Sequence, residues 1–412
     1  MIFSIAWKNV WRNKLRSLII ILSISLGLLG GIFYLAFANG MAQQQINTSI
    51  KTFITNIKLH NPNYLINHEI IYTIANPEEK LKIIKATDGV KASTLRLISP
   101  GMASSAITGT GIFLNGIYPK EEINVSDINT KIIKGSYFES ELKNQALIGE
   151  KLANKLNIKV KSKLVVTIQN AAGDISYGAF RVVGIYKTDH SAFDQLQVFV
   201  RKKDLSKLIG VDESTVNEIS VLLTHNNLTK SVKEKLKSDF ADEIESEQVI
   251  VRSWDDIQPI LKMLNEMTIQ FSMIFVIIIL VALSFGIINT MLMAIMERVR
   301  EIGMLMAIGM NKLKLFLMIL LETVFLSITG GVIGLSLSFI VIEITGNSGI
   351  DLSIVGEGLN SMGYSSFVYP EIDNYYYLLI GLLVVVTALF ASVLPARKAL
   401  KFNPAEAVRH DV

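Results

Sequence analysis

The sequence predicts an α-helical membrane protein with four transmembrane helices and a large mixed α/β extracytoplasmic domain between the first and second helices. Half of the 412 residues are hydrophobic, and the mean hydropathy is clearly positive, which is unusual for a soluble chain of this length. Four apolar runs are long enough to cross a membrane, because about 20 helical residues cover a hydrocarbon core of about 30 Å. The long segment between the first two runs has the alternating helix and strand patterns of a globular domain.

The apolar runs set the boundaries that we expect for the parts of the chain. The first run extends from Leu18 to Ala38, and the fourth opens with three consecutive tyrosines that suit a membrane interface. In chain order, the expected parts are a cytoplasmic amphipathic lead (1–17), the first transmembrane helix (18–40), the extracytoplasmic α/β domain that ends in a stalk helix (41–265), the second transmembrane helix (266–295), a cytoplasmic helical loop (296–314), the third transmembrane helix (315–345), an extracytoplasmic loop (346–372), the fourth transmembrane helix (373–396) and a cytoplasmic tail (397–412).

Basic residues next to the apolar runs predict the orientation, because cytoplasmic flanks carry an excess of Lys and Arg. The segment 346–372 contains acids but no Lys or Arg. Both termini and the 296–314 loop are therefore expected in the cytoplasm. The net charge of +4 is small for this length, which argues against a nucleic-acid partner. The basic flanking residues are Lys8, Arg12, Lys14, Arg16, Arg298, Arg300, Lys312, Lys314, Arg397, Lys398, Lys401 and Arg409.

The first apolar run has a second interpretation, as a cleaved signal peptide. Ala36 and Ala38 have the spacing of a signal-peptidase site after a basic segment and an apolar segment. The run is longer than a usual signal-peptide core, so we expect it to remain as a transmembrane helix. Trp7 and Trp11 are one helical turn apart and can lie together at the cytoplasmic interface.

Local patterns predict several elements of the extracytoplasmic domain. "NPEEKLKIIK", "EKLANKLNI" and "SVKEKLKSDF" have helical spacing, whereas "KLVVTIQN", "AFRVVGIYK" and "QLQVFVRK" are typical of strands. Ala172-Gly173-Asp174 indicates a hairpin between two of these strands. Ser253 and Asp256 form a capping-box pattern. Helical spacing then continues past Pro259 into the second apolar run, which predicts one stalk helix continuous with the transmembrane helix.

Several kinds of chemistry are missing from the sequence. There is no cysteine, which excludes disulfides and thiol catalysis. No G-x-x-x-x-G-K-[ST] motif occurs, so the chain carries no Walker-type nucleotide cradle. "GTGIFLNG" has the wrong spacing for a dinucleotide fingerprint, and the five histidines are dispersed. We therefore expect no catalytic residues, no cofactor-binding residues and no metal site on this chain.

Glu322 interrupts the third apolar run. An ionisable residue within a span is a candidate for a proton path or a polar substrate contact. The alternative, which we favour, is that Glu322 faces the bundle and pairs with a basic residue near the cytoplasmic boundary. Lys314, for example, lies about 12 Å away on the same helical face.

The stretch "AIMERVREIGMLMAIGMNKLK" places Glu297, Arg298, Arg300 and Glu301 between two apolar runs. Four charges at membrane depth would cost about 10 kcal/mol, so this stretch lies in the cytoplasm or at its interface. Gly309 can end a short helix there, and Asn311 can begin the next. Val299, Ile302 and Met306 share one face of that helix. A plain amphipathic connector would have this pattern, but such compactness favours a docking element.

At this point the sequence resembles a known family. "ERVREIGMLMAIGM" is similar to the coupling-helix signature of FtsX/MacB-type ABC transporter permeases of the mechanotransmission class, and "LPARKALKFNPAEAVRHD" resembles their C-terminal tail. "AWKNVWRNKLRSLIIILSISLG" is similar to their amphipathic beginning. "IKGSYFESELKNQALIGEKLANKLNIKV" and "FRVVGIYKTDHSAFDQLQVFV" resemble segments of their outer domain.

The resemblance implies a permease that lacks its own ATPase and pairs with a separate ABC ATPase subunit, which would hold the ATP and Mg²⁺. A second permease chain would complete a homodimer or heterodimer in the bacterial inner membrane. ATP-driven closure would move the coupling helix, the stalk and then the outer domain. By this resemblance, the helix that docks into the ATPase contains Glu297, Arg298, Arg300, Glu301, Ile302 and Gly303.

Among these permeases, the chain looks most like those that release lipoproteins from the inner membrane and pass them to a periplasmic carrier. The hairpin 168–180 occupies the place of the carrier-recruiting loop but is short. An efflux permease for macrolides or antimicrobial peptides is the second choice. The other readings are an FtsX-like regulator of a cell-wall hydrolase, which typically has a smaller outer domain, and a membrane scaffold without an ATPase.

Overall fold

The computed structural model describes residues 2–106, 108–139 and 143–401, which fall into two compact units. The first unit combines the chain up to Ala42 with Asn265–Asp351 and the chain from Phe367 onward. The second unit combines Gln43–Leu264 with Leu352–Ser366. The part of the predicted tail that contains Arg409 lies outside the described residues.

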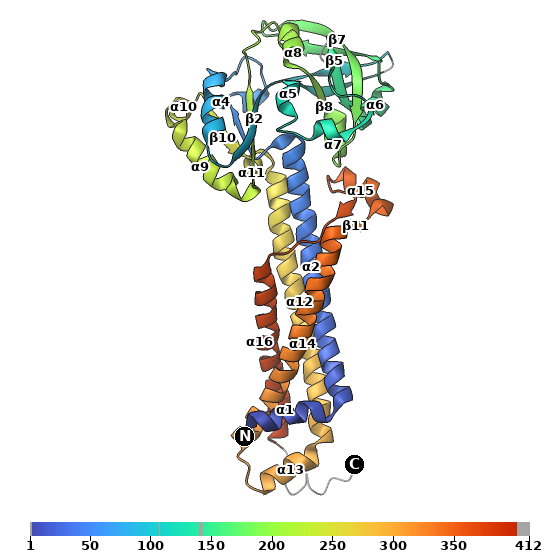
Figure 1. The fold of residues 1–412 in the computed structure, drawn as a ribbon, viewed down its shortest axis with the longest axis vertical. Helices are drawn as coiled ribbons and strands as arrows, with labels where there is room; N and C mark the ends of the chain where they lie inside the picture. Colours follow the sequence, from blue (N-terminus) through green and yellow to red (C-terminus); the bar gives the residue numbers. More distant parts are fainter. Residues whose placement is uncertain (1, 107, 140–142, 402–412) are drawn as a thin grey trace. The chain divides into compact units, whose positions relative to one another are not determined.

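The first unit is built on four helices that are long and apolar enough to cross a membrane, which confirms the number expected. They are α2 (Lys14–Ser49), α12 (Pro259–Glu297), α14 (Lys312–Ser348) and α16 (Asn374–Ala399), and within this unit they run side by side (Figure 1). Helices α2 and α14 approach closely: the Ser25 hydroxyl donates to the Gly330 carbonyl at 2.9 Å. A Cβ added at Gly334 would lie 2.9 Å from the Ser25 Cα, so only glycine permits this packing.

Two shorter helices lie at one end of this bundle, α1 (Ile2–Arg12) and α13 (Val299–Ala307) (Figure 1). Ala6 and Val10 of α1 belong to the same buried apolar cluster as Leu315 and Met318 of α14. Ile302 of α13 also belongs to this cluster. Both short helices are therefore packed parts of the first unit. A two-stranded sheet, β11 (Ile350–Asp351) with β12 (Phe367–Val368), closes the connection between α14 and α16.

The second unit is a mixed α/β domain. Its strands are β1 (Ile57–His60), β2 (Val90–Ser104), β3 (Gly109–Ile117), β4 (Ile132–Gly135), β5 (Gln145–Gly149), β6 (Lys163–Gln169), β7 (Ile175–Tyr186), β8 (Gln197–Arg201), β9 (Glu218–Leu223) and β10 (Ile250–Ser253). Its α-helices are α3 (Tyr64–Asn67), α4 (Pro77–Ala86), α5 (Pro119–Glu122), α6 (Glu150–Leu156), α7 (Ser191–Leu196), α8 (Lys202–Ile209), α9 (Thr229–Asp239), α10 (Ala241–Glu245), α11 (Trp254–Ile257) and α15 (Gly356–Ser361).

The long strand β2 joins the two halves of this domain. Its first half pairs antiparallel with β9, which continues through β1 to β10, and α4 and α9 contribute to the core on that sheet. Its second half pairs with β3 and β6. From β3 the pairing continues through β8, β5 and β7 and returns to β6, so six strands form a closed ring. In a closed ring, the backbone N–H and C=O groups that an open sheet edge would leave unpaired form hydrogen bonds to a neighbouring strand.

Most local predictions for this domain are confirmed. The predicted strands are β6, β7 and β8, and β6 and β7 form the hairpin around Gly173, whose φ of +90° suits glycine. The capping box of Ser253 and Asp256 is present. The continuous stalk helix is wrong in one respect: α11 ends at Ile257, and α12 starts at Pro259. Proline lacks an N–H group and disfavours the helical conformation of the preceding residue, so Gln258 interrupts the helix.

A network of charged side chains lies in the interior of the domain. Arg96 is fully buried and donates to Glu122 (Nε–Oε2, 3.1 Å), to Glu218 (Nη1–Oε1, 3.0 Å) and to the Phe53 carbonyl (2.9 Å). Lys58 Nζ lies 2.9 Å from Glu218 Oε2. Burial alone would raise the pKa of Glu218, but the surrounding cations and a hydrogen bond from His60 hold this pKa well below its ordinary value. The carboxylate therefore stays ionised and joins β1, β2 and β9.

Replacing Glu218 by alanine is expected to destabilise the domain strongly. Lys58 and Arg96 would lose a shared buried partner, and breaking a buried pair in this way costs about 3–5 kcal/mol. Thermal unfolding of the purified chain in detergent measures the effect as a lower Tm. The matched variant is Glu245→Ala on α10, whose exposed side chain should contribute within about 0.5 kcal/mol. Equal Tm values for the two variants would contradict the role of the network.

Another buried carboxylate, that of Asp194 on α7, makes the stability of the domain depend on pH. Its side chain accepts hydrogen bonds from the Thr188 N–H (3.1 and 3.0 Å) and the Thr188 hydroxyl (2.7 Å). Burial raises the pKa of Asp194 from 3.8 to about 6 despite these bonds. The folded state therefore binds this proton more tightly than the unfolded state does.

Stability contributed by Asp194 should consequently increase as the pH falls from about 7 to about 5, since protonation relieves the cost of the buried charge. Asp194→Asn keeps an acceptor for Thr188 and removes the titration. We expect the difference in Tm between the wild-type chain and this variant to change over that pH range. A difference that stays constant with pH would contradict the shifted pKa.

Candidate functional site

The segment between α12 and α14 is a short helix with a defined start and end. Arg298 leaves helical geometry between α12 and α13, with φ −109° and ψ 13°. After α13, Gly309 has a φ of +94°, a left-handed conformation that favours glycine. The Asn311 side chain accepts from the Leu313 N–H at 3.0 Å and caps α14. The predicted roles of Gly309 and Asn311 are thus confirmed.

The inner face of α13 is apolar and packs on the bundle. Val299, Ile302 and Gly303 are buried, and Met306 is partly buried against the same cluster. The shared face predicted for Val299, Ile302 and Met306 is confirmed. This packing fixes which way the remaining side chains of α13 point.

Arg298 links α13 to α14. Its Nη1 lies 3.2 Å from Glu322 Oε2, and its Nε lies 3.0 Å from Glu301 Oε2. Burial alone would lower the pKa of Arg298, but the nearby carboxylates of Glu322 and Glu301 raise it. Glu322 is buried, and the Asn9 side-chain amide also donates to it at 2.6 Å. The basic partner of Glu322 is therefore Arg298, which lies before the start of α14.

Helix α1 and the start of α2 hold the same segment through two further arginines. Arg12 Nη2 donates to both carboxylate oxygens of Glu301, at 2.7 and 2.6 Å. Arg16 forms an ion pair with Glu297. Burial would raise the pKa of Glu301, but hydrogen bonds from Arg12 and Arg298 outweigh this effect and lower it. We call the set Asn9, Arg12, Arg16, Glu297, Arg298, Glu301 and Glu322 the charged clasp.

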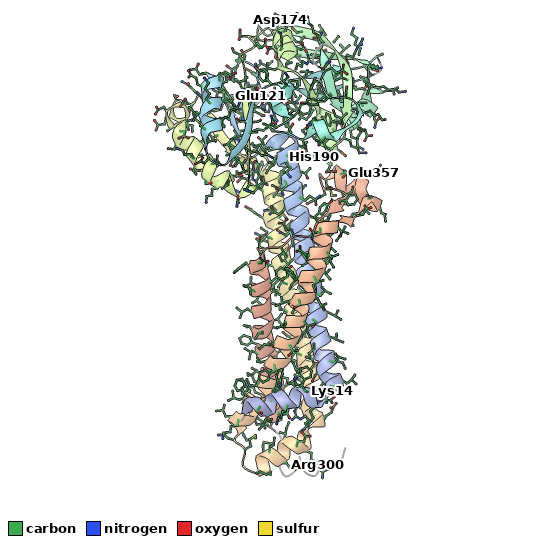
Figure 2. The ribbon with its side chains drawn as sticks, in the orientation of Figure 1. Lys14, Glu121, Asp174, His190, Arg300 and Glu357 are labelled. Carbon is green, nitrogen blue, oxygen red and sulfur yellow. The ribbon has the colours of Figure 1, made fainter. Side chains whose placement is uncertain are left out.

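The outward face of α13 has a different character. Met304 and Ile308 are 48% and 83% exposed. Arg300, one turn before Met304, and Ala307, next to Ile308, are also exposed. Arg300, Met304 and Ala307 follow each other at intervals of four and three positions, and Ile308 lies directly after the end of α13. We call these four residues the outer stripe. Figure 2 labels Arg300 on α13 and Lys14 at the start of α2.

The six residues that were expected to dock the ATPase differ in their surroundings in the structure. Ile302 and Gly303 are buried, while Glu297, Arg298 and Glu301 contact other parts of the first unit. Arg300 is exposed and belongs to the outer stripe. Sequence reasoning missed Asn9, Arg12 and Arg16 as clasp residues. One observation pointed to them: the basic N-terminal flank that contains these residues and the 296–314 loop were both expected on the cytoplasmic side of the membrane.

A second feature is an apolar groove of about 490 Å³ between α2 and α12. Its lining includes small residues that leave room beside larger apolar ones: Gly27, Gly30, Gly31, Ala282, Gly286, Tyr34, Phe275 and Ile279. The apolar part of α12 is also the least buried among the four membrane-length helices, with 17% of it buried. Among the described residues, no group of three or more His, Cys, Asp or Glu side chains is placed to hold a metal ion.

Comparisons with known proteins define the class of the chain. The MacB-like periplasmic core domain family matches residues 17–239, and the FtsX-like permease C-terminal family matches residues 273–404. The chain therefore belongs to the FtsX-like permeases that carry a MacB-like periplasmic core domain. This class agrees with the resemblance carried by the coupling-helix signature.

Individual relatives are distant. An uncharacterized ABC transporter permease of Methanocaldococcus jannaschii is 25% identical over 99% of this chain and 97% of its own length. The lipoprotein-releasing system transmembrane protein LolC of Buchnera aphidicola is 25% identical over 81% of each chain. The macrolide export ATP-binding/permease protein MacB of Vibrio parahaemolyticus is 24% identical over 97% of this chain, which spans 58% of that relative. The periplasmic region of MacB from Actinobacillus actinomycetemcomitans covers 53% of this chain and 98% of its own, with 15% identity and a TM-score of 0.35.

Replacing Arg298 by alanine is expected to destabilise the first unit, because the buried Glu322 would lose its cation. The loss should be about 3 kcal/mol, at the lower end of the cost of breaking a buried ion pair. Arg300→Ala on the same helix is the matched control, since Arg300 is exposed and should cost less than about 0.5 kcal/mol. Thermal unfolding in detergent compares the two variants. If Arg298→Ala unfolds at the wild-type temperature, the clasp does not stabilise α13.

Proposed function

We propose that this chain is the permease subunit of an ABC transporter and couples ATP hydrolysis by a separate subunit to work on the outer side of the bilayer. The observation that carries this proposal is α13, a short helix held firmly between two membrane-length helices with its outer stripe exposed. In this proposal both termini and α13 are cytoplasmic, and the α/β domain lies outside, between the first and second transmembrane helices. The Lys and Arg flanks support this orientation.

The outer stripe is the surface that we assign to the ATPase subunit. Exposed apolar side chains beside an arginine are the composition found at the centres of protein interfaces. Met304 and Ile308 provide the apolar contact, and Arg300 provides a charge. Arg298 and Glu301 have a different role in this proposal, because their contacts hold α13 in position for the ATPase.

Helix α12 is the element that we propose transmits the movement. It is a single helix of 39 residues, about 58 Å long at 1.5 Å per residue. Its lower end at Glu297 precedes α13, and its upper end at Pro259 follows the α/β domain in the chain. Closure of the ATPase would displace α13 and then α12. The work would be done by the outer domain.

We propose lipoprotein release as the task, in the inner membrane of a bacterium. The apolar groove between α2 and α12 supports a cargo with acyl chains, because its lining is apolar and lies within the membrane-length helices. Export of macrolides or antimicrobial peptides would use an apolar groove equally well. A periplasmic carrier would find an apolar contact on the β6–β7 hairpin, where Ile175 and Tyr177 are 65% and 71% exposed.

The double variant Met304→Lys/Ile308→Lys tests the docking surface. Two lysines in an apolar contact should weaken ATPase association by about thirtyfold, equivalent to about 2 kcal/mol at the centre of an interface. Co-purification of the ATPase subunit in mild detergent and stimulation of its ATPase activity measure the effect. Ile354→Lys is the control, because Ile354 is fully exposed but lies in the second unit.

Undiminished association of the double variant would refute the outer stripe as the docking surface. The same pull-down examines the cargo: acylated lipoproteins that leave the chain when ATP is added favour lipoprotein release. A chain that never co-purifies with an ATPase in several detergents would refute the permease proposal itself.

A further inference from the structure

We infer that the outer face of α1 is a binding surface for the headgroups of anionic lipids. This surface lies opposite the side of α1 that takes part in the charged clasp. The inference goes beyond the proposed transport function and does not depend on it, since it concerns only this chain and the membrane. Three observations carry it: the aromatic face of α1, the depth of α1 along α14, and two unpaired lysines, one on α1 and one at the start of α2.

The outer face of α1 is aromatic. Phe3, Trp7 and Trp11 follow each other at intervals of four residues and are 65%, 47% and 44% exposed. Trp7 packs edge-on against Trp11, with ring centroids 5.9 Å apart, and against Phe325 of α14 at 5.3 Å. Exposed indole rings of this kind are typical of the headgroup level of a bilayer, where one edge is apolar and the N–H is hydrated.

The position of α1 along α14 matches the edge of a bilayer. Asn9 contacts Glu322 at 2.6 Å, and Glu322 lies about 15 Å along α14 from Lys312. The part of α14 from Glu322 to Ser348 is about 40 Å long, close to the thickness of a bilayer with its headgroups. With Ser348 at one headgroup layer, this length puts Glu322, and with it α1, at the depth of the other layer.

The charges of α1 and its junction with α2 divide into two pairs. Arg12 and Arg16 contact Glu301 and Glu297. Lys8 and Lys14 are exposed and form no ion pair with any residue that the structure describes. No acidic residue precedes Glu69 in the chain. The two lysines are therefore left for an external anion, and each lysine near an anionic bilayer contributes to binding.

An acidic protein surface would also attract these lysines, but the aromatic face favours a lipid. Only Asn13 separates this short helix from the membrane-length helix α2, which brings the outer face of α1 to the bilayer surface. Lipid binding on the outer face would also fix the position of Asn9 and Arg12 on the inner face. Because these side chains contact Glu322 and Glu301, the headgroup layer and α13 would be connected through α1.

Tryptophan quenching tests this inference with the full chain. The protein has three tryptophans, so a Trp254→Phe background leaves emission from Trp7 and Trp11 alone. This chain is reconstituted into vesicles of equal parts phosphatidylcholine and phosphatidylglycerol, with either lipid brominated in turn. Brominated phosphatidylglycerol should quench more strongly, by about twofold or more, because the lysines enrich anionic lipid around α1.

Lys8→Gln/Lys14→Gln should abolish the excess quenching, and high salt should reduce it by screening. Lys82→Gln/Lys85→Gln on α4 removes two exposed lysines elsewhere and should leave the excess unchanged. Equal quenching by the two lipids, or no quenching by either, would overturn the inference. Equal quenching together with weaker ATPase binding by Lys8→Gln/Lys14→Gln would assign the lysines to an acidic protein surface instead.

Discussion

The arrangement of the first unit depends on the guanidinium group of Arg298. A guanidinium carries several N–H donors in a rigid fork, so one side chain can contact two carboxylates at once. Arg298 uses this geometry to join Glu301 of α13 to Glu322 of α14. Arg12 and Arg16 bring α1 and α2 to the same segment through Glu301 and Glu297. Without these contacts, apolar packing alone would have to orient a nine-residue helix.

The clasp has a consequence for the surface that α13 presents. Charged residues of a surface helix usually point to water, but three of the four charges in this segment are used within the first unit. The outer stripe that remains contains one arginine and exposed apolar side chains. Such a surface is costly to leave in water and well suited to a partner. This division supports a role for Arg298 and Glu301 in positioning α13. It supports a role for Met304 and Ile308 in contacting the proposed ATPase partner.

The interior of the α/β domain contains a similar arrangement of one arginine between two glutamates. Arg96 contacts Glu122 and Glu218, as Arg298 contacts Glu301 and Glu322. In both places one guanidinium with two carboxylates joins separate elements: Arg96 bridges 122 positions to Glu218, and Arg298 joins the consecutive helices α13 and α14. Buried ion pairs contribute little net stability, because desolvation offsets their attraction. Their geometry nevertheless favours one arrangement of the elements, since a misplaced element would leave a buried charge without a partner.

The sequence by itself determined the features that depend on short stretches of chain. A membrane requires about 20 consecutive apolar residues, so the four long helices could be predicted from run length. Enrichment in Val, Ile and Phe predicted β6, β7 and β8, and capping chemistry predicted the roles of Ser253, Gly309 and Asn311. The residues of α13 were also predicted as a compact helix with an inner face of Val299, Ile302 and Met306. The break at Gln258 was missed because helical spacing was weighed above the effect of Pro259.

Only the tertiary structure decided which charges pair and which remain exposed. Arg12 and Glu301 are 289 positions apart, and no local period encodes which arginine meets which glutamate. The closed ring of β3, β8, β5, β7, β6 and β2 is likewise a matter of long-range pairing. Ion pairs and strand pairs form between whatever groups the packing brings within a few ångströms. That packing is settled by the burial of apolar surface over the whole unit, which no short stretch of sequence contains.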